Sequence, residues 1–511
     1  MLDDKEVRLR RSIAFALAAF LCLGGSARAG PASAAAGEPE PMFRLFAPPR
    51  GLLALAGNSR TAAPLRAIRL PMPFGENGAV LSREKPKKHF WVASAEVLGL
   101  EVLTWAFGRY YLDAPYSRIS LDVWKTNLRT GFDFDQGDDF STNQVEHPFH
   151  GSFYYNAART NGFNLWESAL FTAAGSVLWE YFGENQLPST NDLINTSLGG
   201  VSQGETAYRL STMILDNTAS GSSRLWREIG GFLLNPIGGL NRAFRGQMTK
   251  DFPNPEDRLP GSFSVELYAG YQHLGDGTAK AVPYPRQALF GLLIRYGDPF
   301  SGPNRKPFDF FETELELAQH SNPPISRLNQ RGQLASWAVS SSPSAEHRVA
   351  AFLGYEYNND QSQIYSSMTF TANLLSRFPM AGGAEVRTEL SAVGLPLAAL
   401  QVDFTDEDIA RVDRPYDYTL GGGVQVQARL YRRRMDLLSV TYKAVWLHTV
   451  SGIAENSAVQ TIRLEGRLPI VGSLAAGGAW SWNRRITSYQ DLPTARVEGS
   501  QWRIFGVLLL Q

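Results

Sequence analysis

The sequence predicts an α+β protein that is predominantly β: a roughly twelve-stranded antiparallel outer-membrane β-barrel that follows an N-terminal helical module. Two observations predict this class. First, only 19% of the 511 residues are charged and 12% are aromatic, with 47 glycines, yet the mean hydropathy is −0.20, which is too polar for a bundle of membrane helices. Second, from Gly261 onward apolar and polar residues alternate with a period of two, which places apolar side chains on one face of each strand.

The N-terminus has the pattern of a cleaved secretory signal peptide over residues 1–29. Basic residues precede an apolar run from Ile13 to Leu23, and the small residues around Ala29 offer a cleavage site. The only cysteine, Cys22, lies inside the apolar run and follows Leu21, which is not the small residue that lipidation requires. We therefore expect export to the outer membrane of a Gram-negative bacterium, with no disulfide and no cysteine-based zinc site in the mature chain.

The charge balance excludes one class of partner. Lys and Arg number 49, and Asp and Glu also number 49, so the chain lacks the basic excess that holds nucleic acid. The partners that we expect are outer-membrane lipid and the barrel-assembly machinery. No cofactor and no oligomeric state follow from the sequence.

The region before the barrel divides in two. Residues 30–85 show no sustained period, which predicts a mostly disordered lead-in. Residues 86–250 predict helices at about 90–111, 163–182, 204–215 and 222–234. The first two are long enough to cross a bilayer, but each carries two glutamates, and an acid at the bilayer centre costs about 2.5–3.5 kcal/mol. This favours a periplasmic or barrel-associated module over inner-membrane helices.

The region 260–511 predicts a transmembrane barrel. Its alternating segments are separated by turn residues, and many have Tyr, Trp or Phe near their ends, as membrane barrels do. A soluble β-sandwich would have shorter strands. The twelve segments lie near 262–274, 287–297, 310–317, 332–341, 347–358, 362–375, 383–393, 417–433, 436–449, 457–469, 472–486 and 496–510.

An ordered set of motifs lies between residues 143 and 242. It begins with NQVEHPFHGSFYYNAAR at 143–159 and continues with WEYFGE at 179–184 and PSTNDLINT at 188–196. Together with NPIGGLNR at 235–242, this block resembles the bacterial domain-of-unknown-function family DUF3943. The resemblance implies an exported protein with β-rich sequence after the domain, and it implies no accepted reaction.

Within this block, acids and histidines are the candidate catalytic or metal-binding residues. Glu180 and Glu184 are four residues apart, so on a continuous helix they share a face and need a cationic partner. His147 and His150 flank a proline turn. Two His and two Glu are suitable ligands for Zn²⁺, Mn²⁺ or Fe²⁺. The H-E-x-x-H signature is absent, and no single helix carries both ligand types.

A structural role for the same residues is the alternative. Here the histidines hydrogen-bond the helix that follows, and the acids pair with arginines in a buried network. Ser189 or Asn191 is expected to cap a helix. Gly199, Gly200 and Gly204 lack the spacing of phosphate loops and are expected to be packing or turn glycines. The predicted members of the polar network are Arg159, Asp192, Glu205 and Arg209.

A lipid hydrolase needs a further test, because His320 and Ser321 end a predicted barrel strand. Adjacent strand residues point to opposite faces, whereas a His–Ser pair on one face needs a spacing of two. The favoured function is therefore non-enzymatic: a barrel protein whose helical module plugs, gates or presents a polar site at the barrel. The alternative is an envelope hydrolase that acts on lipids or esters, or with a metal, through the module's acids and histidines or through His320 and Ser321.

Overall fold

The computed structural model describes residues 81–82, 86–134, 139–275, 285–301, 306–321, 324–360, 363–403, 414–490 and 492–510. The predicted signal peptide and nearly all of the predicted lead-in lie outside these residues. Leu81–Ser82 forms strand β1, which pairs in parallel with β2 (Asn254–Pro255).

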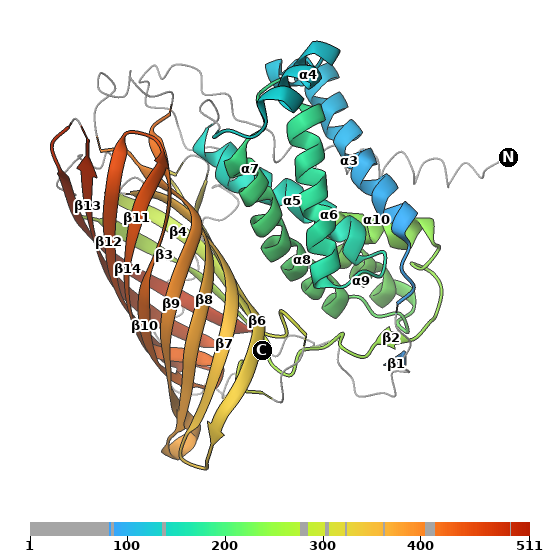
Figure 1. Ribbon diagram of the computed structural model, residues 1–511. Helices are drawn as coiled ribbons and strands as arrows, with labels where there is room; N and C mark the ends of the chain where they lie inside the picture. Colours follow the sequence, from blue (N-terminus) through green and yellow to red (C-terminus); the bar gives the residue numbers. More distant parts are fainter. Residues whose placement is uncertain are drawn as a thin grey trace.

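Twelve consecutive strands close into an antiparallel barrel in which the last strand, β14, pairs with the first, β3. This confirms the predicted class and strand number, and Figure 1 shows the barrel beside the helices. The strands are β3 (Phe263–Leu274), β4 (Arg286–Tyr296), β5 (Phe311–Ala318), β6 (Ile325–Ser341), β7 (Glu346–Asp360), β8 (Gln363–Pro379), β9 (Ala384–Gln401), β10 (Tyr416–Arg432), β11 (Met435–Ser451), β12 (Ala454–Val471), β13 (Leu474–Tyr489) and β14 (Ala495–Leu510).

Two strands extend well beyond their predicted bounds. β6 begins at Ile325 rather than near 332, because its first half carries arginines and asparagine that face the lumen and interrupt the apolar pattern. β9 continues past residue 393 through Pro396 to Gln401. The pairing register shifts opposite this proline, and such a bulge tolerates a residue that has no N–H to donate.

The helical module is built around α5, in which ten of thirteen residues are buried. His147 and His150 belong to the first turns of this helix and do not flank a proline turn, because the backbone is already helical at Glu146 and continues through Pro148. The helices are α3 (Phe90–Tyr110), α4 (Leu121–Thr130), α5 (His147–Arg159), α6 (Leu165–Leu178), α7 (Thr190–Ile194), α8 (Gly200–Ile214), α9 (Gly221–Leu234) and α10 (Pro236–Phe244), with short 3₁₀ turns η2 (Pro115–Ser117) and η6 (Ala381–Gly383).

Glycines let α5 and α8 approach each other closely. A Cβ on Gly200 would lie 2.7 Å from the Cα of Gly151, and a Cβ on Gly204 would lie 2.6 Å from the ring of Tyr155. These contacts are shorter than any side chain tolerates, so the glycines are packing residues, as the sequence predicted.

The module lies against the outer wall of the barrel. Phe352 and Gly354 of β7 line the lumen, and successive strand residues point to opposite faces. Leu353, Tyr355 and Tyr357 therefore point outward, yet each is at most 3% exposed. What covers them is the module, whose α8 contacts β6 and β7 and lies on the side of the barrel in Figure 1.

Direct contacts fix this packing. The ring of Phe140 lies 5.6 Å from the ring of Tyr357 and 5.3 Å from that of Tyr416. Asn143 Nδ2 donates a hydrogen bond to Tyr416 Oη at 2.7 Å. Among the described residues, the cavity inside the barrel is lined by strand residues alone, so the described helices do not occupy the lumen.

Candidate functional site

Three short π-helical turns interrupt the helices of the module at one place. They are η3 (Thr142–Glu146), η4 (Trp179–Gly183) and η5 (Asn195–Gly199). Such turns are rare in proteins, and those that occur are often found at functional sites. The first leads directly into His147, the second contains Glu180, and the third follows the helix that carries Asp192.

These three side chains converge. One ligand atom each from His147, Glu180 and Asp192 lies within 4.8 Å of the other two. The imidazole Nε2 of His147 lies 3.6 Å from Asp192 Oδ1. All three residues are buried, with exposed fractions of 9%, 0% and 2%. One imidazole and two carboxylates form a donor set that suits a divalent transition metal.

The turn before α7 positions the two acids. Ser189 caps this helix: its hydroxyl accepts from the backbone N–H of Asp192 at 3.3 Å. The backbone N–H of Ser189 donates to Glu180 Oε2 at 2.7 Å, and Asn191 Nδ2 donates to Asp192 Oδ1 at 2.9 Å. On the other side, His147 Nδ1 is hydrogen-bonded to Thr196 Oγ1 at 3.1 Å. Each member of the cluster is thus oriented by a further polar group.

Two of the predicted site residues lie outside this group of ligand atoms. Glu184 has extended backbone angles beyond the end of η4, so it does not share a helical face with Glu180 as the spacing suggested. His150 packs between Tyr154 and Trp179 and is hydrogen-bonded to Thr104 at 3.3 Å. Burial lowers its pKa to about 3, with a smaller contribution from His147, so this imidazole is neutral at neutral pH.

The predicted polar network is present but is a separate cluster. Glu205 accepts hydrogen bonds from Arg159 Nε and Arg209 Nε, both at 2.8 Å. Arg209 also reaches Asp309, in the loop before β5, at 3.0 Å. Burial by itself would raise the pKa of Glu205, but the two arginines hold this pKa below its usual value. This cluster ties the module to the barrel.

Asp192 does not belong to this network, contrary to the prediction. The structural alternative assumed that Arg159 and Arg209 pair with Glu180 and Glu184, but both arginines pair with Glu205. The reason is distance along α5. Arg159 is in its last turn and His147 in its first, which separates them by about 18 Å at 1.5 Å per residue.

His320 and Ser321 lie in the turn after β5, which ends at Ala318. The backbone N–H of His320 donates to Gln287 Oε1 at 3.1 Å. Because both residues lie beyond the strand, no strand face presents them side by side.

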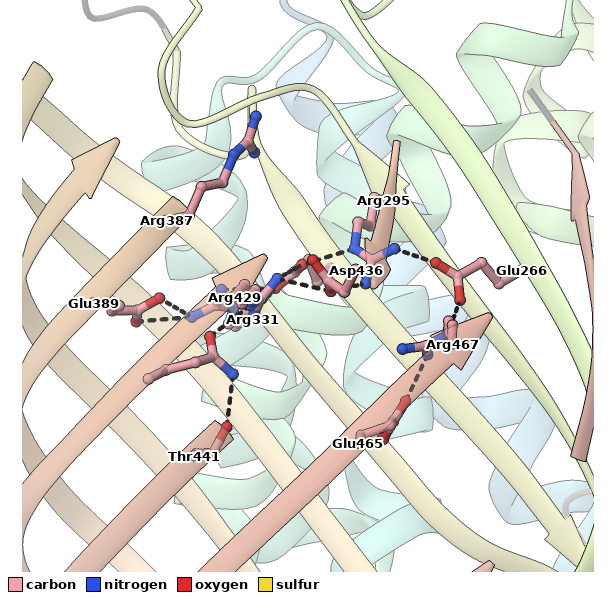
Figure 2. A network of polar contacts seen from close by, with 12 residues as sticks. Glu266, Arg295, Arg331, Arg387, Glu389, Arg429, Asp436, Thr441, Glu465 and Arg467 are labelled. Atoms are coloured by element: carbon pink, nitrogen blue, oxygen red, sulfur yellow. Dashed lines mark hydrogen bonds and ion pairs between the residues drawn. The ribbon is translucent and has the colours of Figure 1, made fainter. Parts of the chain in front are cut away.

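Charged side chains cross the lumen of the barrel (Figure 2). Arg295 of β4 pairs with Glu266 and Glu312 on neighbouring strands, and it reaches Asp436 of β11, on the opposite wall, at 2.5 Å. Arg429 of β10 likewise bonds Glu312 of β5 at 2.7 Å. The space left between these groups is a cavity of about 350 Å³. Further pairs are Arg331–Glu389, Arg467–Glu266, Arg467–Glu465 and Arg503–Glu316.

Sequence reasoning missed two parts of this arrangement. Asp192 was assigned to the wrong cluster, because nothing in the local sequence connects it with His147, 45 residues earlier. The lumen network went unrecognised although its signal is present: Glu312, Glu314 and Glu316 alternate with apolar residues along β5, which places all three on one face.

We compared the chain with protein families, with curated protein sequences and with solved structures. Residues 131–237 match the family model described as Domain of unknown function (DUF3943), which confirms the resemblance seen in the motifs. No curated protein sequence matches the chain.

Solved structures similar to the chain align with about half of it. The KdgM porin has 10% identity and a TM-score of 0.20 over 48% of this chain and 98% of its own. The outer membrane channel DcaP of Acinetobacter baumannii has 8% identity and a TM-score of 0.21, over 48% of this chain and 96% of its own. Outer membrane phospholipase A from Escherichia coli has 12% identity and a TM-score of 0.20, over 49% of this chain and 93% of its own. The chain joins a match to the DUF3943 family, at residues 131–237, to a closed twelve-stranded antiparallel β-barrel.

Proposed function

We propose that this protein is an outer-membrane barrel that holds the helical module against its outer wall, and that the module binds a divalent metal ion between His147, Glu180 and Asp192. The convergence of these three ligand atoms within 4.8 Å carries the proposal. Bonds of about 2.0–2.2 Å from each ligand atom to a metal ion would require these three atoms to move only slightly closer together. The capping turn at Ser189 and the hydroxyl of Thr196 orient the ligands, as groups behind a metal site do.

Metal titration of the full chain tests this site. The purified protein in detergent, stripped with a chelator, should bind one Zn²⁺ or Mn²⁺ in calorimetry. His147→Ala and Asp192→Asn should each weaken binding at least tenfold, because a ligand is lost. His150→Gln is the matched control, since it changes a histidine one turn away on the same helix, and it should leave the affinity unchanged. Equal binding by all three variants would refute the site.

The side chains in the lumen favour a barrel that anchors the module in the membrane over a channel that the module plugs. Arginine–carboxylate pairs bridge opposite walls, and the described helices lie on the outside. In planar bilayers, the full chain should therefore show no steady open-pore conductance. Glu312→Ala combined with Arg429→Ala removes a cross-lumen pair and should raise the conductance. Large steady steps from the unaltered chain would contradict this role.

A metal-assisted hydrolase is the second candidate, because three protein ligands leave a coordination position for water, as catalytic sites do. In that case His147, Glu180 and Asp192 would hold the ion, and the bound ion would supply an activated water. Ester hydrolysis by the metal-loaded chain should then disappear in Asp192→Asn and persist in His320→Ala. Metal binding without turnover would leave the first function and reject this one.

A further inference from the structure

Helix α3 presents most of its apolar side chains to the outside of the molecule. Its 21 residues are long and apolar enough to cross a membrane. The buried residues are only Ala93, Val97, Leu100 and Gly108. The large exposed apolar side chains of this helix are Phe90, Trp91, Val92, Leu98, Val102 and Leu103.

The neighbouring helix α6 extends this apolar surface, and its Leu170 is 71% exposed. Soluble proteins rarely expose contiguous apolar patches of more than a few hundred Å². Further exposed apolar residues of the module are Trp166 on α6, Leu225 and Leu233 on α9, and Phe244 on α10.

The ends of α3 carry the residues that mark the borders of a membrane. Lys87 and Lys88 precede the helix, and Arg109 and Tyr110 end it. Basic and aromatic residues take these positions at the polar interface of a bilayer. At 1.5 Å per residue the helix is about 31 Å long, close to the hydrocarbon thickness of about 30 Å.

The acids that argued against membrane insertion face inward. Glu96 accepts hydrogen bonds from Asn161 Nδ2 at 3.0 Å and from Asn241 Nδ2 at 3.1 Å, both inside the module. Glu101 is not exposed either. The cost of placing a carboxyl in lipid therefore does not arise for this helix.

The position of the module supplies the last step. It covers outward-facing wall positions such as Tyr355 and Tyr357, on the same surface that carries exposed apolar residues, such as Leu438 and Trp446, elsewhere around the barrel. In Figure 1, α3 lies on the side of the module turned away from the barrel.

We propose that the module is an intramembrane domain: its outer face, made by α3 with α6, contacts the acyl chains of the membrane that the barrel spans. The occupant of this face is lipid because the face continues the lipid-facing surface of the barrel and matches the membrane in length and border residues. This inference goes beyond metal binding and does not depend on it.

Site-specific fluorescence tests this contact. Cys22→Ser removes the only native cysteine, so one introduced cysteine takes an environment-sensitive probe. The full chain with Leu98→Cys is reconstituted in phosphatidylcholine vesicles with brominated or ordinary acyl chains. Leu438→Cys on the barrel is the lipid benchmark, and Ser344→Cys in the exposed β6–β7 turn is the water benchmark.

The expected result is quenching of the Leu98 probe by brominated lipid to within twofold of the Leu438 probe, with iodide in the water quenching only the Ser344 probe. Quenching of the Leu98 probe by iodide would overturn the proposal in favour of a periplasmic module. Protection from both quenchers would overturn it in favour of a second protein copy. Leu170→Cys on α6, at a residue that is 71% exposed, provides an independent position with the same expected outcome if Leu98→Cys does not fold.

Discussion

The outer wall of the barrel has two regions that follow the same alternation and carry different side chains. Beneath the helical module the outward positions include tyrosines that are fully buried, among them Tyr355 and Tyr416. On the uncovered side the outward positions include Leu438, Val440 and Ile504, which are 45%, 41% and 70% exposed. Both sets point away from the lumen.

The difference shows that the facing environment, not strand geometry, selects the residue. Tyr355 Oη donates to the backbone carbonyl of Gln144, and Tyr416 Oη accepts from Asn143. A hydroxyl is suitable there because the module supplies polar partners. Lipid offers no such partners, and the uncovered wall carries many aliphatic side chains and indoles, with a few tyrosines such as Tyr442. The covered region is thus a protein interface built on a surface that elsewhere faces lipid.

The largest expected effect on the covered side comes from Glu205→Ala. It removes the carboxylate that Arg159 and Arg209 share, although Arg209 keeps its contact with Asp309, and breaking a buried ion pair costs about 3–5 kcal/mol. Denaturant unfolding of the full chain should show this loss. The control is Glu498→Ala, which lies 45% exposed and pairs with the partly exposed Arg484, and such surface pairs contribute about 0–1 kcal/mol. Comparable losses in the two variants would show that the network does not hold the module.

The next effect concerns the uncovered side. Val440→Arg should destabilise the folded barrel in vesicles by about 2–4 kcal/mol if residue 440 lies near the bilayer midplane. Ser344→Arg, in an exposed turn, should change the free energy of unfolding by less than about 0.5 kcal/mol. A tolerated arginine at 440 would place this wall in water and remove the basis of the comparison.

The sequence predicted the barrel well and the interface not at all. Period-two alternation is local, so all twelve strands could be located, and errors arose where lumen arginines or Pro396 broke the apolar pattern. The site was harder. His147 and Glu180 were identified by residue type, but their approach to Asp192 depends on three π-helical turns and on packing between helices. No local pattern encodes such turns, and none shows which outward tyrosines a distant helix will cover.

The smallest effect is also the sharpest comparison, because it makes one chemical change in both regions. Tyr416→Phe removes the oxygen that accepts from Asn143 Nδ2 at 2.7 Å, and a lost buried hydrogen bond costs about 0.5–1.5 kcal/mol. Tyr442→Phe removes the same oxygen from an outward residue of the uncovered wall that is 38% exposed, and it should cost less than about 0.5 kcal/mol. Unfolding midpoints of both variants in the same vesicles give the answer. If the two losses are equal, or if Tyr442→Phe costs more, then the tyrosines beneath the module do not owe their place to its polar groups, and the covered wall is only a lipid-facing wall that a helix happens to shield.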